Sequence, residues 1–138
     1  MPHTGIIDES LEGGEMLYMR AKLHVKGGLE RFSDGMTTDA IAAIYDAISS
    51  AMQRYLLLDD VNCVIKRGED EDISNDHTLF EVLLRSGCFD KNTTSDDFGF
   101  IEQTLDDAIE DRLGSFDETS FLDVSLDILR QLGIEAEL

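Results

Sequence analysis

Three side chains are candidates for acid–base chemistry: Arg20, His24 and His77. Arg20 and His24 are four residues apart, so on a helix they share one face and can act as a cation and a general base. The same spacing is typical of an amphipathic helix with two polar positions on its surface. The sequence therefore predicts a catalytic site only if the three side chains converge in a cleft, and it favours the non-catalytic alternative.

The other reactive residue types have simpler structural interpretations. Tyr45 and Tyr55 lie in a strongly apolar segment, where a buried phenol usually finds a hydrogen-bond partner. Cys88 follows Gly87 at an expected helix end, a place that does not favour its thiolate. We expect Cys63 and Cys88 to be reduced and partly buried rather than joined in a disulfide framework.

Sequence motifs for a metal or a cofactor are absent. The three histidines are far apart, and neither Glu-x-x-His nor His-Glu-x-x-His occurs, so di-iron and zincin sites are not indicated. There is no glycine-rich phosphate loop after a strand and no serine nucleophile elbow. We therefore predict neither a bound metal nor a cofactor.

One acidic segment, "GEDEDISND", needs to be weighed as a calcium loop. Counted from Asp70, the twelfth position is Glu81, as a helix–loop–helix calcium site requires, but the sixth is Asn75 instead of glycine. The sequence favours a solvated, irregular acidic loop over residues 59–76. Alternating apolar residues near its start leave open whether 59–68 is strand, helix or loop.

The charge of the chain is strongly negative and unevenly distributed. The formal net charge is −19, and residues 59–138 hold 22 acidic and six basic residues. Such a surface repels phosphate backbones, which excludes non-specific nucleic-acid binding. Three interpretations stay open: solubility or adaptation to salt, binding of a basic protein or a divalent cation, and mimicry of nucleic acid towards a basic partner.

The length of 138 residues indicates a single domain, 1–138. No apolar run approaches the roughly 20 residues that span a bilayer, so no membrane association is expected. The first residues, "MPHTGIIDES", have neither the basic nor the apolar region of a signal peptide. The expected location is the cytoplasm.

Apolar spacing by three and four predicts two long helices in the first half of the chain. The first starts at Ser10 or Glu12 and continues through Gly27 and Gly28 to about Ser33, although a helix end at the glycines is the alternative. Gly35 suits the turn that follows. The second helix is capped by one of residues 37–39 and ends near residue 58.

Three shorter helices are predicted in the second half. One is capped by Asn75 or Asp76 and ends at Gly87. The next starts at residue 96 or 97 and ends at residue 114, and the last is capped by Asp117 and ends at Gly133. The inward stripe expected for the fourth helix is Phe98, Ile101, Leu105, Ile109 and Leu113. Together these segments predict an all-α, up-and-down bundle of about five helices.

The second helix has more apolar and small positions than one partner helix needs, which predicts a homodimer that uses the first two helices. The residues expected at this interface are Leu29, Phe32, Ile41, Ile44, Tyr45, Ile48 and Met52.

The same two helices resemble HEPN-type helical domains and the archaeal proteins related to them. The residues that carry the resemblance are Gly28-Leu29, Phe32, Gly35, Ala40, Tyr45, Ala47, Ala51-Met52 and Leu56-Leu57. Nuclease members of the family carry an arginine, four to six residues and then a histidine near the last helices, and this chain has no histidine after Arg112. The resemblance therefore implies a HEPN-like, non-catalytic protein-interaction or adaptor module. The alternative is a degenerate nuclease or a toxin–antitoxin relative.

Overall fold

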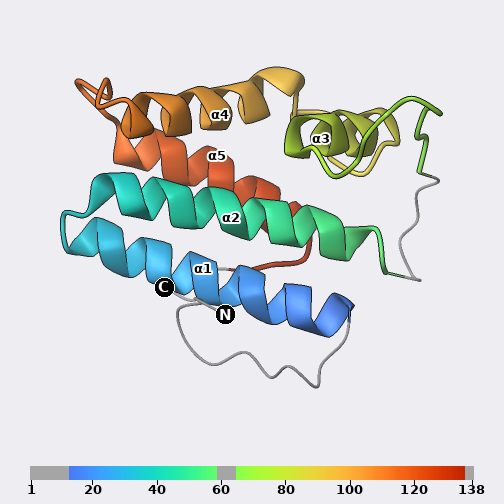
Figure 1. The fold of residues 1–138 in the computed structure, drawn as a ribbon, viewed down its shortest axis with the longest axis horizontal. Helices are drawn as coiled ribbons and strands as arrows, with labels where there is room; N and C mark the ends of the chain where they lie inside the picture. Colours follow the sequence, from blue (N-terminus) through green and yellow to red (C-terminus); the bar gives the residue numbers. More distant parts are fainter. Residues whose placement is uncertain (1–12, 59–64, 136–138) are drawn as a thin grey trace.

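A computed structural model describes residues 13–58 and 65–135. It contains five α-helices and no strand within these two ranges, as Figure 1 shows, so the predicted all-α bundle is confirmed. The helices are α1 (Gly14–Ser33), α2 (Thr37–Tyr55), α3 (Asp76–Arg85), α4 (Ser95–Ile109) and α5 (Glu118–Gln131). None of the described helices is both long and apolar enough to cross a membrane.

The helix starts in the second half follow from local capping. The side-chain oxygen of Asn75 accepts a hydrogen bond from the Thr78 backbone N–H at 3.0 Å, which begins α3 as expected. At α5, Asp117 accepts from the backbone N–H of Ser120 at 3.2 Å. The carboxylate of Asp97 accepts from the Thr94 backbone N–H at 3.0 Å, so α4 begins slightly earlier than predicted.

The first two helices form an antiparallel hairpin. Helix α1 runs unbroken through Gly27 and Gly28 to Ser33, as predicted, and Gly35 makes the turn with a φ of +78°. The prediction for the cap of α2 was wrong: Thr37 is already helical, and the flanking residue is Met36, whose side chain makes no capping bond. The helix ends at Tyr55, three residues before the expected end.

The end of α4 also differs from the prediction. The helix stops at Ile109, because Asp111 takes a left-handed φ of 57° and the Arg112 backbone N–H bonds the carbonyl of Asp107 at 2.6 Å. The residues that face inward are Phe98, Ile101, Thr104 and Ala108. The prediction that Ile109 is inward was therefore wrong. Its side chain is 66% exposed, because the preceding residue, Ala108, is the one that packs towards α2.

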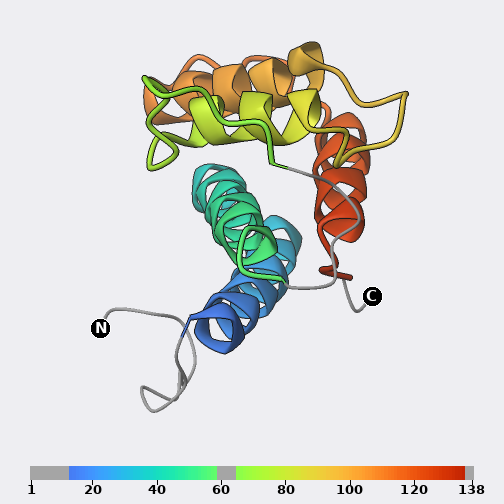
Figure 2. The ribbon, with the colours of Figure 1, turned by 90° about the vertical axis from the view of Figure 1, so that its right-hand side faces the viewer.

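Helix α2 lies at the centre of the bundle. It packs against each of the other four helices, whereas α1 packs mainly on α2 and reaches α5 through the ring pair of Phe32 and Phe121. Figure 2 shows α3 and α4 on one side of α2, α1 on the other and α5 alongside. This central position agrees with the large apolar surface of α2, because four helices of the same chain pack against it.

Aromatic side chains fill the core between the layers. The ring of Phe80 stacks on Phe98 with centroids 4.7 Å apart and on Phe89 at 5.0 Å. At the other end of the bundle, Phe32 lies 6.1 Å from both Phe116 and Phe121. Offset ring pairs at these distances stabilise a core beyond simple burial.

Candidate functional site

The three predicted catalytic candidates lie in different surroundings. His24 on α1 lines a hollow at the α1–α2 surface together with Arg31 and Asp46. Neither Arg20 nor His77 lines this hollow; Arg20 is half-buried on α1, and His77 is exposed on α3. The structure therefore does not bring the three side chains together there.

His77 forms an ion pair that joins two helices. Its Nδ1 lies 2.6 Å from Oε1 of Glu102 on α4, and its Nε2 lies 4.0 Å from Oε1 of Glu81. The hydrogen bond with Glu102 raises the pKa of His77, because the carboxylate favours the charged imidazolium. An imidazolium held between two carboxylates stabilises the contact of α3 with α4 and is a poor general base.

Tyr45 and Asp76 connect α2 to the first turn of α3. Asp76 accepts a hydrogen bond from Oγ of Ser49 at 2.7 Å and a second one from the Tyr45 hydroxyl. Burial raises the pKa of Tyr45 strongly, and the nearby Asp76 carboxylate adds to the effect. The phenol thus stays protonated as a donor, which suits a structural role rather than that of a nucleophile.

Asp46 is a titratable group that the sequence did not single out. Burial raises the pKa of its carboxyl, whereas nearby His24 lowers it and Asp76 raises it further. The group lies on the exposed side of α2, at the border between the α1–α2 hollow and the Tyr45–Asp76 pair. His24 of α1 and Asp76 of α3 thus act on the pKa of Asp46 in opposite directions.

The residues expected at a dimer interface lie within the chain's own core. Ile41, Ile44, Ile48 and Met52 are fully buried between α2 and its neighbours. Phe32 is buried as well, while Leu29 and Tyr45 are half-buried against the same core.

Two carboxylates in the described part of the acidic loop accept hydrogen bonds from nearby groups of the chain. Glu71 accepts two hydrogen bonds from the Arg85 guanidinium, each at 2.6 Å, and one from the Gly68 backbone N–H. Asp72 accepts from both the backbone N–H and the hydroxyl of Ser74. Over residues 13–58 and 65–135, no group of three or more His, Cys, Asp or Glu side chains is placed to hold a metal ion. Cys88 is half-buried; Cys63 and the rest of 59–64 fall outside the described residues.

A groove along the contact of α4 with α5 is the most distinctive surface feature. Two hollows lie along this contact, one towards each end of the helix pair, and their linings share no residue. From α4 it is lined by residues 97, 100, 104 and 107, and from α5 by residues 117, 120, 124 and 127. Each set repeats at intervals of three and four, so each is a single helix stripe. We call this surface the α4–α5 groove; Asp123, Ile128 and residues 113, 115 and 116 complete its lining.

The chemistry of the α4–α5 groove combines an aromatic floor with negative charge. Phe100 is 40% exposed there, and its ring centre lies 6.5 Å from that of the buried Phe121. Among the residues that the structure describes, five aspartates line the groove, and none of the lining residues is a lysine, arginine or histidine. Arginines pair with two of these acids: Arg130 bonds Asp127 at 2.6 Å, and Arg112 lies 3.6 Å from Asp107.

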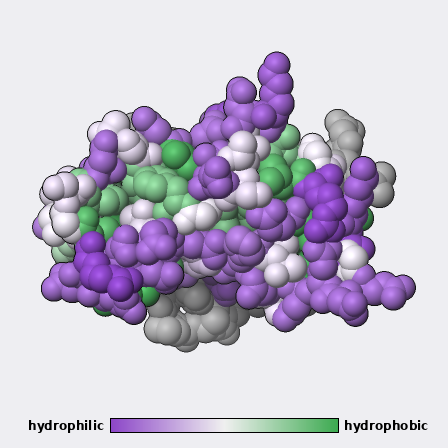
Figure 3. Space-filling view, turned by 90° about the horizontal axis from the view of Figure 1, so that it is seen from above, coloured by the Kyte–Doolittle hydropathy of each residue, from purple (hydrophilic) through white to green (hydrophobic). Residues whose placement is uncertain are grey.

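Figure 3 shows the face formed by α3 and α4, where hydrophobic residues are exposed between hydrophilic ones. The groove was not identified from the sequence, because its lining comes from two separate helices. A signal was present: acid, aromatic and acid recur at helical spacing in Asp97, Phe100 and Asp107. These residues of α4 line a groove only because α5 packs beside them.

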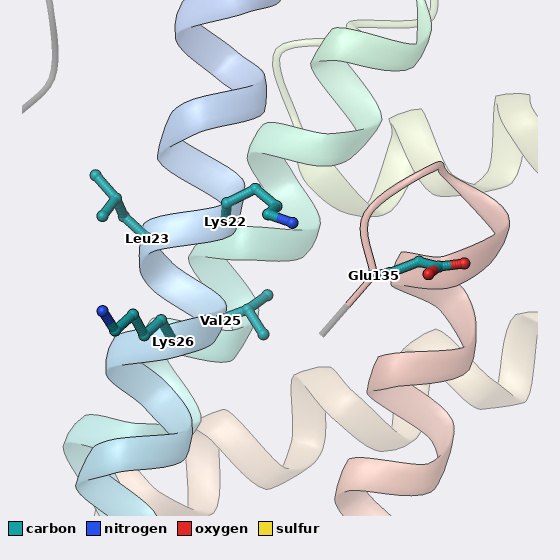
Figure 4. A pocket seen from close by; sticks show the side chains of 5 residues that line it. All are labelled: Lys22, Leu23, Val25, Lys26 and Glu135. Carbon is teal, nitrogen blue, oxygen red and sulfur yellow. The ribbon is translucent and has the colours of Figure 1, made fainter. Parts of the chain in front are cut away.

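A smaller hollow of different chemistry lies where α1 meets the segment after α5 (Figure 4). Its lining residues are Lys22, Leu23, Val25, Lys26 and Glu135. Lys22 and Val25 extend towards the side of Glu135, whereas Leu23 and Lys26 point away to the other side of α1. These side chains diverge, so the hollow has no set of convergent polar groups for a small ligand.

Comparison of the chain with protein-family models, with curated proteins and with solved structures gave no significant match.

Proposed function

We propose that this protein is a non-catalytic helical interaction module that binds a basic protein partner through the face containing the α4–α5 groove. The observation that carries the proposal is the groove itself, where an exposed aromatic ring lies among five aspartates without a lining cation. Apolar area supplies affinity, and a field of one sign attracts a partner of the opposite sign and increases its association rate.

The degenerate-nuclease alternative has less support. It needs a cation and a general base in one cleft; the hollow lined by His24 contains Arg31, but neither Arg20 nor His77, the partners predicted for this histidine. The acidic field also opposes the approach of RNA. The HEPN-like resemblance remains a prediction, and the proposal does not depend on it.

A homodimer also remains a prediction. Five of the seven residues expected at its interface are buried within one chain, while Leu29 and Tyr45 are half-buried, so two copies would also have to use other exposed surface. Light scattering at micromolar protein concentration tests this directly, and a monomer mass would contradict the dimer.

The test of the proposed function compares two variants with the same change of charge. The first neutralises groove acids (Asp107→Asn, Asp123→Asn and Asp127→Asn), and the control neutralises exposed acids outside the groove lining, at the start of α1 and in the loop before α3 (Glu15→Gln, Glu69→Gln and Asp70→Asn). Each variant and the parent chain are used for quantitative affinity capture from an extract of the native cells. Circular dichroism first establishes that both variants keep their helix content.

We expect basic proteins to be captured by the parent chain and by the control variant, and to be lost with the groove variant and on adding salt. Equal capture by both variants would contradict the proposal, because charge outside the groove would then be sufficient. Capture of nucleic acid, or of acidic proteins alone, would contradict it as well.

A further inference from the structure

The α4–α5 groove has a definite order along its length. Its first hollow brings Asp97 of α4 beside Asp123 and Asp127 of α5. Its second hollow places Asp107 of α4 with Asp117 and Ser120 of α5. Acids from both helices therefore occupy the two ends.

The middle of the groove has a less polar lining. Phe100 and Thr104 of α4 lie on the stripe between Asp97 and Asp107, and Val124 lies on the stripe of α5. The two acids of α4 are ten residues apart, which on a helix is about 15 Å, or nearly three turns. The groove thus offers an acid–apolar–acid pattern over the length of a short helix.

On this basis, and resting on the proposed function, we infer that the α4–α5 groove binds an amphipathic helix of a basic partner protein. The helix presents an apolar side chain to Phe100 and Val124, and lysines or arginines on either side of it to the acids at the two ends. A trough between two packed helices is a common seat for an amphipathic helix.

The backbone of the groove walls favours a helical ligand over an extended one. Both walls are α-helices, whose N–H and C=O groups already bond within the helix, so the walls offer no free edge to an extended chain. An extended segment would have to leave its own backbone groups without partners over the apolar floor. A helix satisfies these groups internally and turns only side chains to the groove.

Charge complementarity selects the sign of the ligand. Arg130 and Arg112 each pair with one groove acid, and both are themselves more than half exposed. Asp97 and Asp117 accept hydrogen bonds at helix starts, and the hydrogen bonds with Ser120 lower the pKa of Asp117. Net negative charge thus remains at both ends, so an acidic or neutral helix would be desolvated there without compensation.

Three synthetic peptides of about 18 residues, five helical turns, separate the contributions. The first has a leucine face flanked by lysines. The second keeps every lysine but has glutamine for each leucine, and the third has the composition of the first in an order without an apolar face. Binding to the full chain is measured by fluorescence anisotropy in low salt, and amide shifts in ¹⁵N NMR spectra locate the bound peptide.

The matched variants are Phe100→Ala in the groove and Ile109→Ala, an exposed apolar residue of the same helix outside it. We expect the first peptide to bind at least tenfold more tightly than the other two, with shifts at residues 100, 104, 120 and 124. Phe100→Ala should weaken this peptide about tenfold, as expected for an aromatic anchor. The same substitution should leave the affinity for the second peptide unchanged, and Ile109→Ala should change the affinity for neither the first nor the second peptide.

Two negative results have different meanings. Equal binding of all three peptides, unaffected by Phe100→Ala, would overturn the helix inference and leave the binding of a basic partner intact. No binding of any peptide in low salt would overturn the proposed function as well. If the Phe100→Ala variant does not fold, the amide shifts that the first peptide causes in the parent chain provide the test. Shifts confined to helices other than α4 and α5 would overturn the inference.

Discussion

Gly28 of α1 lies directly against Ile44 of α2. A Cβ atom built on Gly28 would be 2.8 Å from Cδ1 and 2.9 Å from Cγ1 of Ile44, and 3.3 Å from the carbonyl oxygen of Ala40. Real Cβ atoms essentially never come so close to other heavy atoms, so only glycine lets the two helices pack at this separation. The glycine pair that looked like a possible helix end is thus part of the helix contact.

Gly28→Ala should destabilise the protein even though alanine is the better helix former. The gain in helix propensity is about 1 kcal/mol, and overpacking a core contact costs typically about 1–3 kcal/mol. Urea denaturation followed by circular dichroism measures the free energy of unfolding. We expect the overpacking cost to exceed the gain and lower this free energy.

The neighbouring Gly27→Ala is the matched control. Its Cβ would meet only the end of the Arg31 side chain, which can rotate away, so we expect unchanged or increased stability. If Gly28→Ala stabilised the protein as much as Gly27→Ala did, the close helix contact would be disproved.

The helix starts could be predicted from sequence because their causes are local. Asn75 and Asp117 bond backbone groups three residues ahead, and Gly35 supplies the left-handed turn. The rotation of α4 about its own axis has no local cause, because it depends on which α4 residues pack against α2. At this contact the Thr38 hydroxyl of α2 lies 3.5 Å from the carbonyl oxygen of Ala108. For that reason the exposure of Ile109 was mispredicted.

The candidate site shows the same division. The acidic and aromatic residues of the α4–α5 groove can be read from the sequence. That Phe100 and Val124 lie along the same helix contact depends on how α4 packs beside α5. The excess of apolar residues on α2 was interpreted as a dimer interface, because sequence spacing does not tell how many helices of the same chain surround it.

Phe80→Ala tests the aromatic core. The ring is fully buried and stacks on both Phe89 and Phe98, so its removal leaves a cavity between α3 and α4. We expect the free energy of unfolding to fall by about 3–5 kcal/mol. Ile109→Ala should change it by less than about 0.5 kcal/mol, because this side chain is mostly exposed. Similar losses in the two variants would mean that α4 is rotated differently.

The His77–Glu102 pair predicts a pH effect. Because the hydrogen bond with Glu102 raises the pKa of His77 above its usual 6.5, the ion pair contributes fully below that pH and is lost as pH rises through the folded-state pKa. An NMR titration of the His77 ring should show the raised pKa, and Glu102→Gln should lower it towards 6.5. Glu81→Gln should lower the pKa less, since that carboxylate is 4.0 Å away. Equal effects of the two variants would contradict the assigned hydrogen bond.

The Glu71–Arg85 pair predicts the opposite pH dependence. Hydrogen bonds from Arg85 lower the pKa of Glu71 to about 2 from its usual 4.5. The pair therefore holds the loop to α3 above pH 4.5 and releases it as pH falls through the lowered value. A ¹³C NMR titration of the carboxyl should find the low pKa, and Arg85→Met should raise it by at least one unit. An unchanged value in Arg85→Met would show that the arginine is not its partner.

Ile48→Ala distinguishes a core residue from a dimer contact. Ile48 is fully buried in the single chain, so we expect the substitution to lower the free energy of unfolding by about 2–5 kcal/mol. For a residue packed within one chain, the melting temperatures of parent and variant do not depend on protein concentration. For a residue at an obligate dimer interface, melting couples to dissociation and shifts with concentration by mass action. Melting curves over a hundredfold range of concentration decide between the two, and a rise in melting temperature with concentration that Ile48→Ala abolishes would support the interface predicted from sequence.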